Sequence, residues 1–362
     1  MLSSLSTDPA SGRRKERRVV PPEPGEPSRP ARIKDVAARA GVSLKTVTNV
    51  VHQRPYVKAE TRARVQAAID ELDYRPSLAG RQLQSGRSNM ITLAVPRIDE
   101  PYLGALAHRL IAAAAPRGYT VVMDETGGRV EREEQAARGY PGHGIDGVIY
   151  SPLALNPQLL AAMSRDTPMV LLGEPLPGSS ADYVAIDNQG SAHEVVDHLV
   201  AQGRRRFVFL GGQPGLYPGV GEQRALAVDH RLAEHGLAPD DLVITTGRFR
   251  RGEGARRTRE SLERLRDCDA LVCASDLLAL GAMFALREAG IGTPDDIAVV
   301  GWDNIDDGAY SQPTLTSVAP DLGALAEKAV DALITRIEGD RSESRSYVVP
   351  HELIIRRSSV RP

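Results

Sequence analysis

The feature that most constrains the fold is an alternation of short apolar runs with helical stretches, which continues from about residue 90 to residue 338. Runs with the length and composition of strands lie at 90–95, 119–123, 147–150, 169–172, 183–186, 206–210, 270–273 and 297–300. Helices are predicted between them at about 102–116, 189–202, 222–236, 254–266, 276–289 and 320–338. Continuous apolar strands separated by helices predict parallel sheets that are covered on both faces. About 270 residues are more than one such sheet usually holds, so we expect two doubly wound α/β subdomains with a ligand cleft beyond the carboxyl ends of their strands.

The totals fit a soluble chain of two or three domains. The chain has 362 residues, of which 41% are hydrophobic and 25% charged. It has no run near the roughly 18 apolar residues that a membrane span needs, and its first residues lack the apolar core of a secretory signal. The two cysteines, Cys268 and Cys273, cannot form a disulfide framework and are expected to be ordinary buried thiols. This usage fits a reducing cytoplasm best.

The residues before the α/β pattern predict a small helical domain. Residues 1–31 are rich in Pro, Arg, Glu and Ser and are predicted to be disordered. Residues 32–76 then show apolar positions at helical spacing in three short segments, which are Ile33, Val36, Ala37 and Ala40, then Val47, Val50 and Val51, then Thr61, Val65, Ala68 and Leu72. Gly41 is expected to end the first helix and Ser43 to cap the second. This is the layout of a helix-turn-helix.

The charge is divided unevenly along the chain. Residues 1–88 carry 17 Lys and Arg against 9 Asp and Glu, whereas the remainder carries 28 against 38. A basic front end on an acidic body is typical of a phosphate-binding module joined to a separate regulatory domain. The alternative is that the front end is only a solvated charged extension.

The remaining organisation follows from composition. Residues 77–88 are polar and basic with one short helical possibility, and we interpret them as a linker. Residues 89–362 then form the two-lobed body. We expect its first lobe at about 89–187 and 319–346, and its second at about 188–318 and 347–362.

Several dispersed segments resemble one family. DVAARAGVSLKTVTNVVH and VKAETRARVQAAIDELDYRPSLAGRQL resemble the DNA-binding headpiece of the LacI family of bacterial transcriptional regulators. DYVAIDN, HLVAQGRRRFVFLGG, ASDLLALGAMFALREAG, TPDDIAVVGWDN and TLTSVAPDLGALAEKAVDAL follow in the family's order. The resemblance covers residues 32–362. It implies a headpiece, a hinge helix and a periplasmic-binding-protein-like core that acts as a homodimer.

The second helix of the headpiece is the candidate for DNA reading. A major groove admits one α-helix, whose N-terminal residues meet base edges. Lys45 can donate to guanine, Asn49 can bond adenine through both ends of its amide, and Leu44 can touch a thymine methyl group. Four polar residues are suited to phosphates, namely Ser43, Thr46, Thr48 and His52. The alternative is a helix that only packs in a three-helix bundle.

Departures from the family's pattern affect the headpiece and the linker. Arg32 and Lys58 stand where the family tends to place Thr or Ser caps, and each lost cap costs about 1 kcal/mol. In the linker, the resemblance implies that Leu83 is a minor-groove wedge, with Ser77 and Gly80 replacing the more usual Asn and Ala. A glycine inside a helix costs about 1 kcal/mol, so we expect a hinge that folds only when two copies pair over DNA. A plain flexible linker is the alternative.

The effector site is expected in the cleft between the two lobes. Its candidate residues are Tyr102, Arg224, Phe249, Ser275 and Asp303, with Glu174 as a weaker one. A charged Arg/Asp pair offers donors and acceptors to a polyhydroxylated ligand, and an aromatic ring offers it a flat face. The expected effector is a sugar or sugar derivative. For each residue the alternative is an ordinary place in the core or on the surface.

Other chemistries have weaker signals. The segment HEVVD at 193–197 nearly matches a zinc-binding helix, but its fifth residue is Asp197 and His198 is one step off the face. The segment FLGGQPG at 209–215 lacks the ending and spacing of a phosphate loop, and no nucleophile elbow is present. We therefore expect a transcriptional regulator that acts as a repressor at a near-palindromic operator. We expect it to need no cofactor and to have no enzyme activity. The alternatives are a solute-binding protein and a nucleotide-binding enzyme.

Overall fold

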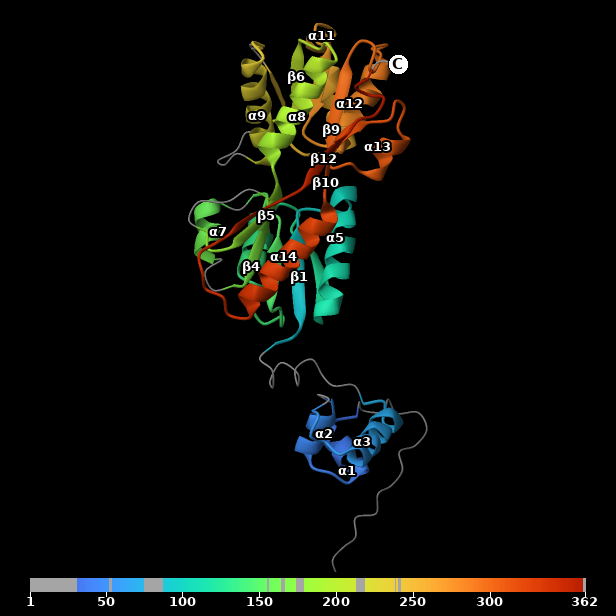
Figure 1. The fold of residues 1–362 in the computed structure, drawn as a ribbon, viewed down its shortest axis with the longest axis vertical. Coiled ribbons are helices and arrows are strands. Elements are labelled where there is room, and N and C mark those ends of the chain that lie inside the picture. Colours follow the sequence, from blue (N-terminus) through green and yellow to red (C-terminus); the bar gives the residue numbers. More distant parts are fainter. Residues whose placement is uncertain are drawn as a thin grey trace, which may run out of the picture. The chain divides into compact units, whose positions relative to one another are not determined.

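The computed structural model describes residues 31–51, 54–74, 87–154, 156–163, 167–173, 179–212, 219–237, 239 and 242–360. The chain divides into two compact units near residue 80 (Figure 1). Nearly all of the predicted tail at 1–31 and of the predicted linker at 77–88 lies outside the described residues, so those two expectations stay predictions.

The first unit consists of α1 (Ile33–Ala40), α2 (Leu44–Val51) and α3 (Ala59–Glu71). Its buried residues include Val36, Ala37, Ala40, Val47, Val50, Val65 and Ala68. These fall on the apolar stripes that the helical spacing predicted. Ile33, Val51 and Leu72 pack against them from partly buried positions. The three helices therefore share one small core.

The turn between α1 and α2 fixes where α2 begins. Gly41 has a left-handed φ of 63°, which a residue without a side chain adopts at no steric cost. The Oγ atom of Ser43 then accepts a hydrogen bond from the N–H of Thr46 at 3.2 Å, so the predicted cap is present. At α1 the Arg32 side chain makes no cap, but the Asp35 carboxylate accepts from the Arg32 N–H at 2.8 Å. Lys58 makes no side-chain cap at α3.

The second unit has two α/β lobes, each built on a six-stranded sheet (Figure 1). The strands of the first sheet lie in the order β11-β5-β4-β3-β1-β2 and are all parallel. They are β1 (Met90–Val95), β2 (Thr120–Glu125), β3 (Gly147–Tyr150), β4 (Met169–Leu172), β5 (Asp182–Ile186) and β11 (Ser346–Val349). The helical elements of this lobe are α5 (Pro101–Ala114), η1 (Ala115–Arg117), α6 (Val130–Ala137), α7 (Pro157–Met163) and α14 (Leu322–Ile337).

The second sheet has the order β12-β10-β9-β8-β6-β7, and only the pairing of β12 with β10 is antiparallel. Its strands are β6 (Phe207–Gly212), β7 (Val243–Thr245), β8 (Ala270–Cys273), β9 (Ala298–Trp302), β10 (Thr316–Pro320) and β12 (His351–Ile354). Its helices are α8 (Asn188–Ala201), α9 (Val220–Glu234), α10 (Arg251–Glu260), α11 (Leu262–Arg266), α12 (Asp276–Glu288) and α13 (Asp306–Tyr310). Within the described residues, no helix is both long and apolar enough to cross a membrane.

The chain passes between the lobes three times, and two of these passages differ from the expected limits. We expected a return to the first lobe at about 319 and a departure after 346. The structure keeps β10 in the second sheet through Pro320, where it pairs with β9 and β12, and pairs β11 with β5 of the first sheet through Val349. The passages therefore follow Ile186, Pro320 and Val349, because backbone hydrogen bonding carries β10 and β11 a few residues further than expected.

Candidate functional sites

The residues predicted to read bases lie on the exposed side of α2. Leu44 is 51% exposed although it is a large apolar residue, and Lys45 is exposed beside it. Asn49 lies one turn further along and is half-buried. Val47 and Val50, on the opposite side, are buried. The helix is thus held by its valines and leaves the three predicted residues available to a partner.

Two of the hydroxyls predicted to contact phosphates have partners within the headpiece. The Oγ atom of Ser43 and the Oγ1 atom of Thr46 lie 2.9 Å apart and share a hydrogen bond. Since the same serine oxygen caps α2, its main role in the structure is to fix the start of that helix. Thr48 is half-buried, and His52 lies outside the described residues.

Sequence reasoning missed one residue at this face. Tyr56 is 69% exposed, and its hydroxyl donates to the Oδ1 atom of Asn49 at 3.2 Å. The proline before it is a turn signal that the sequence does show. Its position opposite Asn49, however, depends on how α3 packs against α2 and has no sequence signature.

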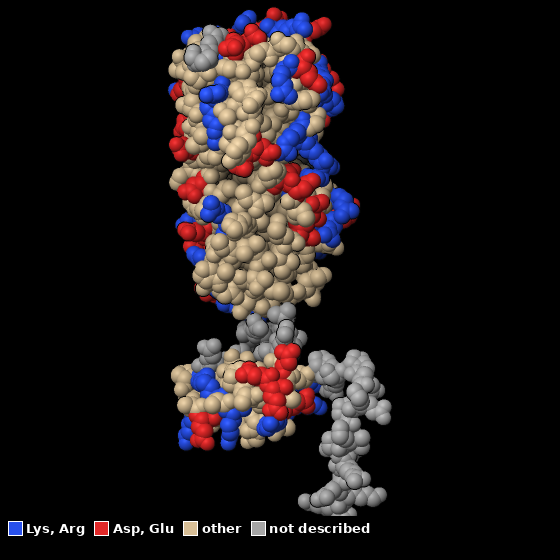
Figure 2. Space-filling view, turned by 90° about the vertical axis from the view of Figure 1, so that its right-hand side faces the viewer, with Lys and Arg blue, Asp and Glu red and all other residues tan. Residues whose placement is uncertain are grey.

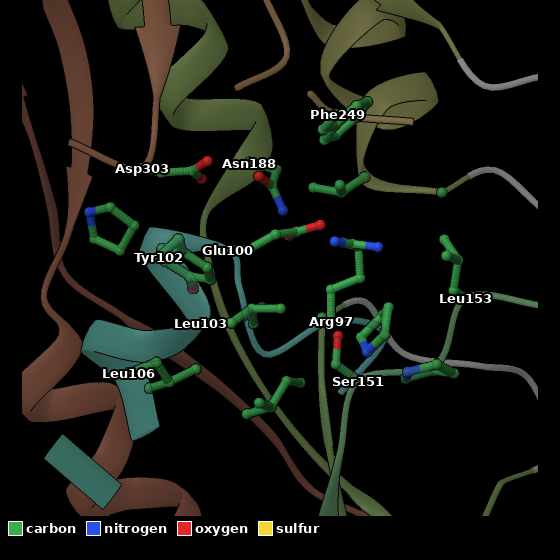
Figure 3. A pocket seen from close by; sticks show the side chains of 18 of the residues that line it. Arg97, Glu100, Tyr102, Leu103, Leu106, Ser151, Leu153, Asn188, Phe249 and Asp303 are labelled. Atoms are coloured by element: carbon green, nitrogen blue, oxygen red, sulfur yellow. The ribbon is translucent and has the colours of Figure 1, made fainter. Parts of the chain in front are cut away.

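The body carries a cavity of about 360 Å³ whose walls come from both lobes (Figure 3). Four of the five predicted effector residues line it, namely Tyr102, Arg224, Phe249 and Asp303. Figure 3 shows Tyr102 on α5 of the first lobe directed toward the same space as Asn188 and Asp303 of the second. The cavity therefore lies where the carboxyl ends of the strands meet, as expected for this fold.

Arg224 is buried and held in place by its neighbours. Its Nε atom donates to Asn188 Oδ1 at 2.8 Å, and one terminal nitrogen donates to the carbonyl of Ala274 at 2.6 Å. The guanidinium also lies 5.0 Å from the centre of the buried Trp302 ring. A planar donor group fixed in this way presents its charge to the cavity in a single orientation.

Asp303 is presented by a strained backbone. Its φ of 102° is unusual for a residue with a side chain, and its N–H donates to the carbonyl of Val318 at 2.9 Å. Burial raises the pKa of the Asp303 carboxyl well above its ordinary range, while Arg224 acts in the opposite direction. Burial also raises the pKa of the Tyr102 hydroxyl, which is protonated and able to donate a hydrogen bond at neutral pH in either case.

A second carboxylate lies behind this turn. Asp276 accepts hydrogen bonds from the Ser317 hydroxyl at 2.7 Å and from the Ile305 N–H at 2.8 Å. Burial raises the pKa of Asp276 to about 7. The neighbouring Asn304 donates its N–H to Ser317 and accepts from Arg356 at 2.8 Å. These bonds fasten the residues that follow Asp303 and so hold its backbone in place.

Ser275 is the predicted effector residue that the structure places away from the cavity. Ser275 does not line the cavity, because it is the N-cap of α12 and its Oγ atom accepts from the Leu278 N–H at 3.3 Å. The Ser275 side chain is also buried, so a ligand in the cleft does not reach it. Glu174, the weaker candidate, lies outside the described residues.

Several polar residues of the cavity were missed by sequence reasoning. They are Arg97, Glu100, Ser151, Asn188, Gln223 and Arg248. Asn188 had a usable signal, because it follows the strand in DYVAIDN at the carboxyl end where ligands bind. Glu100 and Arg97 precede α5 in a loop whose direction no local pattern predicts. Burial raises the pKa of Glu100.

The two weaker motifs lie on α8 and at the end of β6. On α8, the ring of His193 stacks on His230 with centroids 6.0 Å apart, and His198 lies 2.8 Å from the Ser359 hydroxyl. Among the described residues no group of three or more His, Cys, Asp or Glu side chains is placed to hold a metal ion. Phe209 to Gly212 end strand β6, and the rest of FLGGQPG lies outside the described residues.

Comparisons with known proteins agree with this architecture. Residues 32–77 match the family described as bacterial regulatory proteins, lacI family, and residues 196–359 match a periplasmic binding protein-like domain. The transcriptional regulator CelR of Thermobifida fusca is 32% identical over 334 residues, which cover 89% of this chain and 96% of that protein.

Two solved structures are similar over most of their length. The lac repressor dimer bound to operator and an anti-inducer gives a TM-score of 0.82 at 26% identity, covering 92% of this chain and all of that one. The complex of CelR with cellobiose gives 0.66 at 29% identity, covering 91% and 99%. The chain therefore belongs to the LacI family and is a DNA-binding transcriptional regulator with an effector-binding core.

Proposed function

We propose that the protein is a repressor that binds a near-palindromic operator as a homodimer and changes its operator affinity when a small molecule enters the cleft. The observation that carries the DNA-binding part is the outer side of α2, where Leu44 and Lys45 are exposed and Asn49 is half-buried on a helix that Ser43 caps. These three residues meet base edges. Ser43, Thr46, Thr48 and His52 meet phosphates, which set register but carry no sequence.

The residues between the two units complete the DNA interface in this proposal. Ser77, Gly80 and Leu83 lie outside the described residues, and the limits of the linker at 77–88 rest on the sequence alone. The two Leu83 side chains of a dimer enter the minor groove and open the central base step. The lac repressor, solved as a dimer on its operator, supports this arrangement for a chain that resembles it along its length.

A carbohydrate is the proposed effector. Arg224, Asn188 and Asp303 converge on one side of the cavity and offer donors and acceptors to hydroxyl groups, while Phe249 and Tyr102 offer flat apolar faces. About 360 Å³ is at the small end of ligand pockets, which suits a sugar of one or two rings. The cellobiose complex of the related CelR supports the same class.

The homodimer is proposed from the surface of the first lobe. Figure 2 looks at the side of the body on which α5 lies and shows a broad area there without Lys, Arg, Asp or Glu. Ile111 on α5 and Val122 and Met123 on the edge strand β2 are large apolar side chains that stay exposed. A second copy that covers them would remove this apolar surface from water.

We further propose that the protein is not an enzyme and releases the effector from the cleft without changing it chemically. Its relatives are regulators. In the cleft, Arg224 is held by Asn188 and Ala274 as a binding group, and Asp303 beside it is a half-buried carboxyl whose pKa is raised.

Operator binding is tested by selecting sites from a random duplex library and measuring fluorescence anisotropy at about 150 mM salt. The expected result is a near-palindromic site bound at least about 1,000-fold more tightly than random DNA. The absence of any sequence preference at this salt concentration would contradict the proposal and favour a solute-binding protein.

The effector is tested by a thermal-shift screen of sugars with Asp303→Asn and Ser275→Ala beside the parent protein. A ligand that raises the melting temperature of the parent is expected to fail with Asp303→Asn while operator affinity is kept. Ser275→Ala is the matched control, because it loses a helix cap worth about 1 kcal/mol at a residue that does not line the cavity, so its ligand response should remain. A response that survives Asp303→Asn would remove this residue from the site.

A further inference from the structure

The turn that follows α2 presents Tyr56 in a fixed position. The N–H of Val57 donates to the carbonyl of Arg54 at 3.3 Å, which closes a four-residue turn with Pro55 and Tyr56 at its centre. A proline at the first central position presets the backbone of such a turn. Tyr56 therefore lies at the tip of a stiff turn and is 69% exposed.

This turn is fastened to the helices on either side. The N–H of Arg54 donates to the backbone carbonyl of Asn49 in α2 at 3.0 Å. The guanidinium of Arg62 in α3 donates to the carbonyl of Arg54 at 2.7 Å. Val57 packs against the core of the headpiece. The distance between Tyr56 and Asn49 is consequently set by the fold of the headpiece.

The hydroxyl of Tyr56 engages one end of the Asn49 side chain. It donates to Oδ1 of Asn49 at 3.2 Å, so the acceptor end of the amide faces the tyrosine and the NH₂ end is directed elsewhere. A two-ended contact with adenine needs both the acceptor and the donor of an Asn side chain facing the base. A contact through the NH₂ end alone needs only an acceptor, which purines and thymine present in the major groove and cytosine does not.

We infer that Tyr56 is a positioning residue that makes Asn49 a donor-only reader of the base edge, so that Tyr56 sets the specificity of the operator at that position. This inference rests on the proposed function, in which Asn49 meets a base. It replaces the two-ended adenine contact that the sequence suggested for Asn49. The base accepted there is a purine or thymine, and cytosine is excluded.

The test compares the sites selected from a random duplex library by the full-length parent, Tyr56→Phe, Tyr56→Ala and Asn49→Ala. The parent is expected to tolerate more than one acceptor base at one symmetric pair of positions and to deplete cytosine there. Tyr56→Phe keeps the ring and frees Oδ1, so preference for adenine over guanine at that pair should rise about 10-fold, with other positions unchanged. Asn49→Ala should remove the preference at the same pair.

Two outcomes would overturn the inference. One is a parent that already selects adenine alone. The other is a Tyr56→Phe profile that superimposes on the parent profile; if Tyr56→Ala then weakens all sequences equally, the ring contacts only the phosphate backbone of the DNA. A parent that enriches no site at all would instead contradict the proposed function, so the two failures are distinguishable.

Discussion

Lys45 and Asn49 are neighbours on α2 but offer different chemistry to a base. We expect Lys45→Ala and Asn49→Ala each to cost about 1–3 kcal/mol on the preferred operator and little on random DNA, because each removes one base contact. Anisotropy against a set of single-base operator variants measures this. Lys58→Ala is the control, since it removes an exposed charge outside α2 and should weaken all sequences alike. Equal losses on specific and random DNA for the α2 variants would contradict the assignment.

Asp276 gives the body a pH dependence whose sign follows from its raised pKa. The carboxyl has a pKa of about 7 in the folded protein, against 3.8 without burial. Between these values the folded state keeps a proton that the unfolded state has lost, so the free energy of unfolding falls as pH rises from about 4 to 7. The cost of ionising the buried Asp276 carboxyl lowers the free energy of unfolding in full above about pH 7 and not at all below about pH 4. This cost is at most about 4 kcal/mol.

Asp276→Asn should flatten this dependence. The amide cannot ionise, so denaturant unfolding of the variant between pH 4 and 8 should show a smaller loss of stability on the alkaline side than the parent shows. Asp276 also holds the turn that follows Asp303, so the variant shows whether that turn is needed to keep Asp303 in place in the cleft. An unchanged pH profile would show that the buried carboxyl is not the titrating group.

Individual residues also show where sequence reasoning ends. The Arg224 and Asp303 positions could be predicted, because a family motif marks each of them. Ser275 could not, since a serine between a strand and a helix serves equally well as a cap or as a ligand contact, and only the coordinates distinguish the two. For Tyr56 the sequence shows only the turn that Pro55 signals, and its hydrogen bond to Asn49 depends on how the helices pack.

At the scale of elements, α10 and α12 pack closely through glycines. A Cβ added to Gly281 would lie 2.0 Å from the backbone oxygen of Arg251, and neither helix can move without disturbing the other. Gly281→Ala should therefore destabilise the second lobe by about 3 kcal/mol or more. Gly252→Ala in α10 is the matched control, because its Cβ would meet nothing within 4 Å and alanine favours a helix by up to about 1 kcal/mol. Chemical denaturation of both variants measures the difference.

Long apolar elements were predictable and short mixed ones were not. All eight predicted strands are present within a few residues, because each reads as a continuous apolar run. Most of them are buried, whereas the edge strand β2 is largely exposed. The strands β7, β10, β11 and β12 were missed, since they are short or lie near a sheet edge and carry polar residues. The helix expected at 254–266 is two, α10 and α11, with a break at Ser261.

For the whole molecule, the two compact units predict two unfolding events. The headpiece has its own small core, whereas the lobes share one continuous hydrophobic cluster and three chain passages. Calorimetry of the full chain should show a headpiece transition and a separate transition of the body. Val47→Ala should lower the midpoint temperature of the headpiece transition alone, because Val47 is fully buried within the headpiece. Gly281→Ala should lower the midpoint temperature of the body transition alone. A single transition that responds to both variants would contradict independent units.

The last two strands have a genetic consequence. β11 forms one edge of the first sheet and β12 forms one edge of the second, so a stop codon just before residue 346 strips both sheets at once. It would leave the headpiece sequence intact. The strands Asp182–Ile186 and Thr316–Pro320 would become sheet edges with unpaired backbone groups, which promote aggregation. Alleles of this kind should behave as recessive nulls through insolubility, although every residue proposed to contact DNA or the effector is still encoded.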